Sequence, residues 1–123
     1  MERQAAVEKK VHLSWYLAFY GEMLTENQRE IAQLYFEEDY SLAEIAQQFA
    51  VSRQSIHDTV TRVEKTLTDF ENKLGLAARF RRLERGLHAC GHALEKVVPT
   101  EESKPYLQSA KEIIGALLAQ EDM

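Results

Sequence analysis

The chain has 123 residues, of which 45% are apolar and 28% charged, with 5 Gly, 2 Pro and a formal net charge of -5 at pH 7. This profile is that of one compact, helix-rich domain; it excludes disordered and fibrous chains and argues against coating nucleic acid by charge alone. Because there is a single cysteine, Cys90, and neither a signal-peptide core at the N-terminus nor an apolar run that could span a bilayer, we expect a cytoplasmic protein without membrane insertion.

The first predicted helix covers residues 7–24 and carries two overlapping apolar stripes at helical spacing. One stripe is Val7, Val11, Trp15 and Ala18; the other is Leu13, Tyr16, Leu17, Tyr20 and Leu24. Such a helix lies between layers of the fold or under a second subunit, and the spacing leaves both alternatives open.

The second helix is predicted from a capping box, in which Thr25 and Gln28 satisfy each other's backbone N–H groups. We expect it to run to about Glu38. Its inward residues are predicted to be Ile31, Leu34 and Tyr35.

A helix-turn-helix is predicted from Ser41 to about Leu67. Ser41 and Glu44 form a second capping box, Ala50 and Val51 turn the chain, and Ser52 can cap the next helix. The inward residues of the first helix are Leu42, Ile45, Ala46 and Phe49, and the second helix is anchored by Ile56 and Val60. Ala46 is the small residue that a close, steep crossing demands. A left-handed conformation at Ala50 would cost about 1 to 2 kcal/mol.

Two heptad seams follow, because apolar residues recur at alternating steps of four and three. The first is Ile56, Val60, Val63, Leu67, Phe70 and Leu74; the second is Leu76, Phe80, Leu83, Leu87, Cys90, Leu94 and Val97. Gly75 stands between the seams, where a left-handed C-cap is expected, and Pro99 closes the second.

A last helix is predicted from about Lys104, with Tyr106, Ala110, Ile113 and Leu117 on one stripe and Ile114 and Leu118 beside it. The fold class is therefore all-α. We predict an N-terminal helix plus helix-turn-helix core in residues 1–75 and a helical C-terminal extension in residues 76–123. The seams either fold back within the chain or pack across a two-fold axis, for which a homodimer is the simplest form.

The segments Leu24–Gln28, Tyr35–Ala46 and Val51–Ile56 resemble the bacterial YlxM-type helix-turn-helix proteins, a family that is itself similar to region 4 of sigma factors. The close resemblance covers about residues 11–74, and Ala50 stands where the family usually has glycine. The resemblance implies a regulator tied to the signal recognition particle pathway, because genes of this family lie beside those of that pathway's GTPases.

DNA binding would use the outward side of the second helix of the motif. The predicted contact residues are Ser52, Arg53, Gln54, His57, Thr61, Arg62 and Lys65. Arg53 suits guanine and Gln54 suits adenine, whereas Arg62 and Lys65 could reach phosphates. Asp58 faces the same way, and residues 25–50 hold 6 acidic residues against 1 basic one, so a solvated face without DNA contacts is the competing interpretation.

The alternative function is an adaptor that contacts RNA or a protein component of the signal recognition particle pathway. Its candidate surface is a basic patch of Arg79, Arg81, Arg82 and Arg85, for which a solvated, charge-balanced helix face is the competing interpretation. His88 and His92 share a helix face, but a metal site would need a third ligand beside them, so no metal is predicted. No cofactor or catalytic residue is predicted either, because the sequence carries no catalytic motif.

Overall fold

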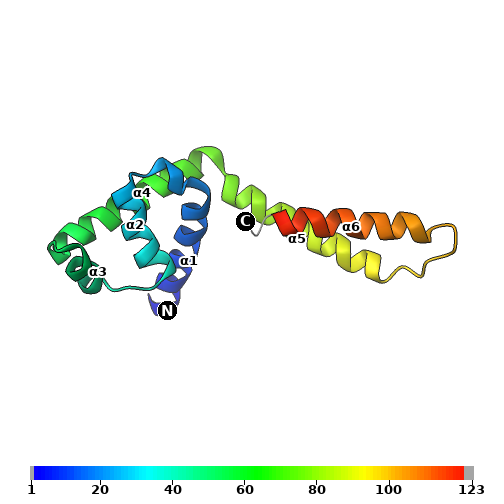
Figure 1. The fold of residues 1–123 in the computed structure, drawn as a ribbon, viewed down its shortest axis with the longest axis horizontal. Helices are drawn as coiled ribbons and strands as arrows, with labels where there is room; N and C mark the ends of the chain where they lie inside the picture. The colour runs from blue at the N-terminus through cyan, green and yellow to red at the C-terminus, as the bar shows by residue number, and fades with distance from the viewer. Residues whose placement is uncertain (1, 121–123) are drawn as a thin grey trace. The chain divides into compact units, whose positions relative to one another are not determined.

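The computed structural model describes residues 2–120, and all of its regular elements are helical. The helices are α1 (Glu2–Tyr20), α2 (Glu26–Ala32), α3 (Leu42–Phe49), α4 (Arg53–Leu74), α5 (Leu76–Glu95) and α6 (Lys104–Gln120), as Figure 1 shows. This arrangement confirms the all-α fold class. The chain divides into two compact units, residues 1–77 and residues 78–123, of which 121–123 lie outside the described residues. No described helix is both long and apolar enough to cross a membrane.

Side-chain caps set the starts of the helices in the first unit. Thr25 and Gln28 form the predicted capping box before α2, and Ser41 and Glu44 form the second one before α3. The Ser52 hydroxyl accepts a hydrogen bond of 3.0 Å from the Ser55 N–H at the start of α4. Each cap satisfies donors that the first helical turn leaves without partners, so the three predicted starts are confirmed.

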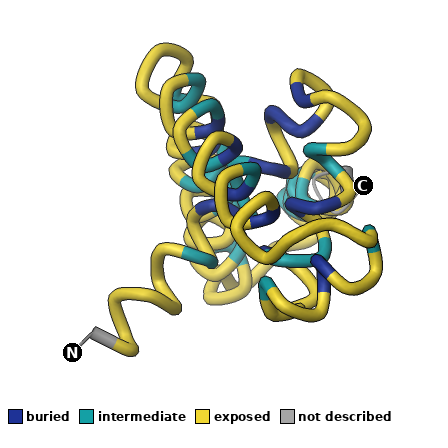
Figure 2. Tube along the Cα trace, turned by 90° about the vertical axis from the view of Figure 1, so that its left-hand side faces the viewer, coloured by how far each residue is buried: buried dark blue, intermediate teal, exposed yellow. Residues whose placement is uncertain are grey.

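The α1 helix buries only one of its two predicted stripes. Leu13, Leu17 and Tyr20 are buried in the core, whereas Val7 and Val11 are exposed. The first turns of the helix project beyond the packed region and are exposed, as the burial colouring of Figure 2 shows. The α1 helix therefore packs into the core on one side only.

A π-helical turn, Gln33–Glu37, follows α2 and changes which side chains face inward. The extra residue in a π turn shifts the helical phase by about one position. As a result Phe36 is buried, with only 5% of its surface exposed, while the predicted inward residues Leu34 and Tyr35 are half-buried. A straight α-helix to Glu38 was the wrong expectation here.

The turn of the helix-turn-helix centres on Ala50, which has φ 56° and ψ 44° in the left-handed region. The Val51 N–H donates to the Ala46 carbonyl oxygen at 3.0 Å, which satisfies a carbonyl that the end of α3 leaves open. An alanine here retains strain of about 1 to 2 kcal/mol that glycine would relieve. The predicted left-handed turn is thus present, held by the packing of α3 against α4.

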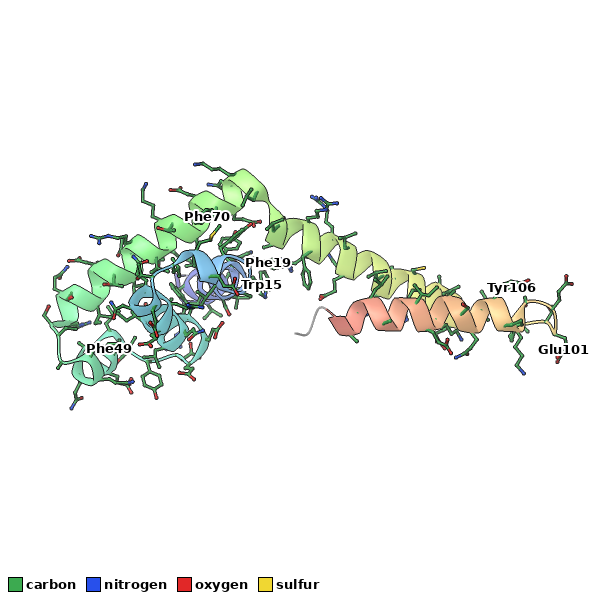
Figure 3. All side chains as sticks on the ribbon, turned by 45° about the horizontal axis from the view of Figure 1, so that its top comes forward. Trp15, Phe19, Phe49, Phe70, Glu101 and Tyr106 are labelled. Carbon is green, nitrogen blue, oxygen red and sulfur yellow. The ribbon has the colours of Figure 1, made fainter. Side chains whose placement is uncertain are left out.

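The core of the first unit lies between α1, α2, α3 and α4. Its fully buried large side chains are Ile45, Ile56, Val63 and Leu67. Figure 3 shows Phe49 and Phe70 at different points along this packing, and both are half-buried against the core. The first seam is therefore buried as far as Phe70, but Leu74 is exposed, because α4 extends past the helices that cover it.

A polar network within the first unit surrounds the end of α4 and the first two residues of α5. The Tyr20 hydroxyl donates to Glu71 Oε1 at 2.6 Å and accepts from the Leu76 N–H at 3.1 Å, and the same carboxylate oxygen accepts from the Ala77 N–H at 3.0 Å. The Tyr20 ring also stacks on Phe70. Gly75 takes the predicted left-handed conformation, with φ 63°. Two side chains thereby cap the first turn of α5 from α1 and α4.

Raising the pH through the titration of Tyr20 is expected to destabilise the first unit. Burial, reinforced by the hydrogen bond to Glu71, raises the pKa of Tyr20. Because the pKa is higher in the folded state than in the unfolded one, the contribution of the protonated phenol is complete below about pH 10 and is lost as the pH rises through the folded-state value. Urea unfolding midpoints between about pH 8 and pH 11.5 should therefore fall more steeply for the wild type than for Tyr20→Phe.

The control for this measurement is Tyr40→Phe, because Tyr40 is exposed and lies outside the network. It removes a phenol without removing the network, so its midpoints should follow the wild type. Equal slopes for wild type and Tyr20→Phe would contradict the prediction.

The second unit is an antiparallel helical hairpin, in which α6 returns alongside α5 (Figure 1). Lys111 and Glu95 form an ion pair at 3.5 Å, and Ile114 lies against Gly91. No described residue from 78 to 119 is buried, however. Cys90, which the second seam was predicted to turn inward, is exposed, because only alternate seam residues face α6.

Candidate nucleic-acid interface

The candidate interface is the N-terminal half of α4, which the turn after α3 presents to solvent. Ser52 caps the helix, so Arg53 and Gln54 occupy its first turn. On the opposite side Ile56, Val60 and Val63 are buried in the core. The orientation of the helix about its own axis is therefore fixed by packing.

All of the predicted contact residues lie on the exposed part of this helix. Their side chains come from the first four turns: Ser52, Arg53, Gln54, His57, Thr61, Arg62 and Lys65. At about 100° per residue, Gln54, Thr61 and Lys65 lie opposite the buried stripe, with Arg53 and Arg62 on either side of them. The set forms one continuous polar surface.

Asp58 occupies the centre of this surface and engages two of the predicted contact residues, Gln54 and His57. The Gln54 amide donates to Asp58 Oδ1 at 2.9 Å, and His57 Nδ1 lies 3.6 Å from the same oxygen. The spacing of four residues between Gln54 and Asp58 was visible in the sequence and could have predicted this hydrogen bond. The carboxylate both orients the two side chains and repels phosphate.

The positive charge on the surface comes from three side chains. Lys65 pairs with Asp69 at 3.6 Å, an exposed contact that contributes little free energy. Arg53 and Arg62 are exposed, and within the described part of the chain neither forms an ion pair. These two arginines are the cations most available to a phosphate backbone.

The elements before α4 add negative charge. Glu37, Glu38 and Asp39 end the π-helical turn, and Asp39 contacts Lys10 at 3.8 Å. Hydrogen bonding from the Ser41 N–H, and then from its hydroxyl, lowers the pKa of Glu44, so this carboxylate is ionised at neutral pH. The segments that precede α4 are therefore acidic, in contrast to the cations on α4 itself.

The basic patch lies in the second unit, on α5. Arg79, Arg82 and Arg85 are exposed, and Arg81 is half-buried. Phe80 and Leu87 mark the half-buried side of the helix. By their angles about the helix axis, the four arginine side chains spread over the rest of its surface. The arginines thus form a broad charged surface instead of a single row.

The two histidines of α5 border a shallow groove between α5 and α6. His88 and His92 share this groove with Glu95 and Lys111. Among the described residues, no group of three or more side chains is arranged to hold a metal ion. Cys90 lies outside the groove.

Comparison with known proteins agrees with this geometry. A family model described as "Putative helix-turn-helix protein, YlxM / p13 like" matches residues 7–103. A UPF0122 protein of Halalkalibacterium halodurans is 37% identical over 103 residues, which is 84% of this chain and 94% of the relative. A UPF0122 protein of Desulforamulus reducens is 49% identical over 69 residues, 56% of this chain and 59% of the relative. One of Anoxybacillus flavithermus is 36% identical over 96 residues, 78% of this chain and 87% of the relative.

No solved structure matches the chain. The matched family is one of helix-turn-helix proteins. The family model spans most of the chain, including every residue of the candidate interface and the basic patch. The chain therefore belongs to the YlxM / p13-like family of helix-turn-helix proteins.

Proposed function

We propose that the protein is a cytoplasmic regulator that binds DNA through its helix-turn-helix, with the first turns of α4 in a major groove. The observation that supports this most is the continuous polar surface on α4, backed by a buried stripe that fixes its orientation. In this role Arg53 reads guanine and Gln54 reads adenine, while Arg62 and Lys65 contact phosphates. Ser52, His57 and Thr61 complete the contact surface.

The expected affinity is modest and depends strongly on salt. With three cations on its surface, one subunit offers about three phosphate contacts at most. For each phosphate contact, the logarithm of the binding constant falls by about 0.9 per tenfold increase in salt concentration. Asp58 opposes binding, because it holds Gln54 and faces the phosphates. A homodimer would present two such surfaces and about double the number of phosphate contacts.

The test is binding of fluorescent genomic fragments at about 50 mM salt, measured by anisotropy and gel retardation. Arg53→Ala combined with Gln54→Ala is expected to weaken binding about tenfold or more, since a bidentate base contact is worth about 1 to 3 kcal/mol. Asp58→Asn is expected to strengthen binding, because it removes a negative charge and keeps the side chain's shape. The control is Lys104→Ala, which also removes one positive charge, but at the exposed start of α6 and outside the interface. It should leave the affinity for DNA unchanged.

Two outcomes would reject the DNA proposal. The first is no retardation of any fragment by the wild type at low salt. The second is binding that neither the Arg53 and Gln54 pair nor Asp58→Asn alters.

The alternative is an adaptor that contacts structured RNA, or a protein of the signal recognition particle pathway, through the basic patch. The exposure of Arg79, Arg82 and Arg85 favours it. The same binding assay with a structured RNA probe distinguishes the two, because replacing these three arginines by glutamine should abolish RNA binding and spare DNA binding. Co-purification from native cytosol with and without nuclease tests for a protein component, whose recovery would resist nuclease.

A further inference from the structure

The hairpin of α5 and α6 cannot account for its own stability. It has helices of 20 and 17 residues, yet none of the described residues from 78 to 119 is buried. Helices of this length are marginal in water without a packed apolar side. The hairpin therefore leaves apolar surface that a partner would cover.

On α5, the second heptad seam divides into two stripes. Phe80, Leu87 and Leu94, seven residues apart, are half-buried. Leu83, Cys90 and Val97, also seven residues apart, are exposed, Leu83 to 55% of its surface. A seven-residue step keeps side chains almost in line, so the exposed stripe runs parallel to the half-buried one, about 40° to 60° around the helix.

On α6 the same division appears. Leu107, Ile114 and Leu118 are half-buried, and Ile114 lies against Gly91 of α5. Tyr106, Ile113 and Leu117 are exposed, Ile113 to 58% of its surface. This exposed stripe lies about 100° from the half-buried one.

The two exposed stripes lie on the same side of the hairpin. Viewed along each helix from its N-terminus to its C-terminus, the exposed stripe is rotated about the helix axis away from the half-buried stripe. In both helices this rotation is opposite in sense to the winding of the chain. Because α5 and α6 run antiparallel, displacements in the same sense bring both stripes to one side. We define this side as the apolar face; its residues are Leu83, Gly86, Cys90, Ala93, Val97, Tyr106, Ile113 and Leu117.

We propose that the apolar face binds the same face of a second copy of the chain, so that two hairpins form a four-helix bundle about a two-fold axis. Its one charged neighbour on α5 is Arg79, which lies seven residues before Gly86 at the start of the helix. On α5 the face also includes Gly86 and Ala93, which allow close approach. Its size also suits a dimer: α5 is about 30 Å long and two adjacent helices are about 20 Å wide, while a standard interface takes about 800 Å² of accessible surface from each partner.

The charges at the two ends of the hairpin favour a second copy over another partner. Arg82 and Arg85 lie near the start of α5, whereas Glu101 and Glu102 lie at the tip, where Figure 3 shows Glu101 beyond Tyr106. A two-fold axis perpendicular to the hairpin sets the basic end of each copy against the acidic tip of the other. Self-association in this antiparallel sense is thus complementary in charge as well as in apolarity. The inference does not depend on nucleic-acid binding.

The test is sedimentation equilibrium of the full chain over a wide concentration range. The wild type is expected to form a dimer of twice the 14.2 kDa chain mass. Leu83→Glu and Ile113→Glu should each raise the dimer dissociation constant at least about 100-fold. Because the dimer is symmetric, either substitution places two unpaired charges in the apolar interface, one from each copy. Val7→Glu is the matched control, since Val7 is 57% exposed on α1, outside the hairpin, and it should leave the dimer intact.

A pair of charge reversals guards against variants that merely unfold the hairpin. Glu101→Lys with Glu102→Lys should weaken the dimer, and adding Arg82→Glu with Arg85→Glu should restore it. A wild type that stays monomeric throughout would overturn the proposal. So would a dimer that survives both Leu83→Glu and Ile113→Glu, or one that only Val7→Glu dissociates.

Discussion

Replacing Ile45 by alanine is expected to lower the free energy of unfolding of the first unit by about 2 to 5 kcal/mol. Ile45 is fully buried on α3, at the centre of the core that α3 shares with α4. A short helix such as α3, with 8 residues, depends on this packing for its position. Since a small domain has only about 5 to 15 kcal/mol of stability, the loss should be visible as a large shift of the urea midpoint.

The control for this change is Val51→Ala in the adjacent turn. Val51 is 46% exposed, so its truncation leaves no cavity and should change stability by less than about 0.5 kcal/mol. A loss below about 1 kcal/mol for Ile45→Ala would contradict the packing of α3 described above.

The second large effect is expected from Glu71→Ala. This change removes the acceptor of the Tyr20 hydroxyl and of the Ala77 N–H, and both residues are 2% exposed. A buried donor left without an acceptor costs about 1 to 3 kcal/mol, so the two together should destabilise the first unit by about 2 to 4 kcal/mol after partial relaxation. Urea unfolding monitored by circular dichroism measures the loss.

Glu64→Ala is the matched control, because it makes the same substitution on the same helix. Glu64 forms only a surface ion pair with Lys9 at 3.1 Å, which is worth about 0 to 1 kcal/mol. Equal losses from Glu71→Ala and Glu64→Ala would show that the polar network contributes nothing beyond helix charge.

The helix starts and stops could be predicted from the sequence because they are local. Ser41 and Glu44 need only each other to form a capping box, and Ala50 takes its left-handed conformation within the turn itself. The buried stripe of α4 could be predicted as well, since spacing alone places Ile56 and Val63 on one side. On the candidate interface, the same spacing predicts which side chains are exposed.

The features that the sequence did not reveal depend on contacts between distant segments. Tyr20 meets Glu71 from 51 positions away, and no spacing rule connects them. The π-helical turn brings Phe36 inward by an inserted residue, which a regular period cannot anticipate. The heptad seam of α5 indicated burial for Cys90, but a seam shows only that a residue can be covered and does not identify what covers it.

The caps have a consequence for the order in which the first unit forms. Because α2, α3 and α4 each begin at a side chain three residues from its backbone partner, their boundaries are defined before any long-range contact exists. Contacts between residues so close in the sequence avoid the entropy cost of closing long loops. Helical domains rich in such contacts fold fast, in about microseconds to milliseconds. The polar surface of α4 would then be oriented when α3 docks onto α4 through the long-range contacts of the core.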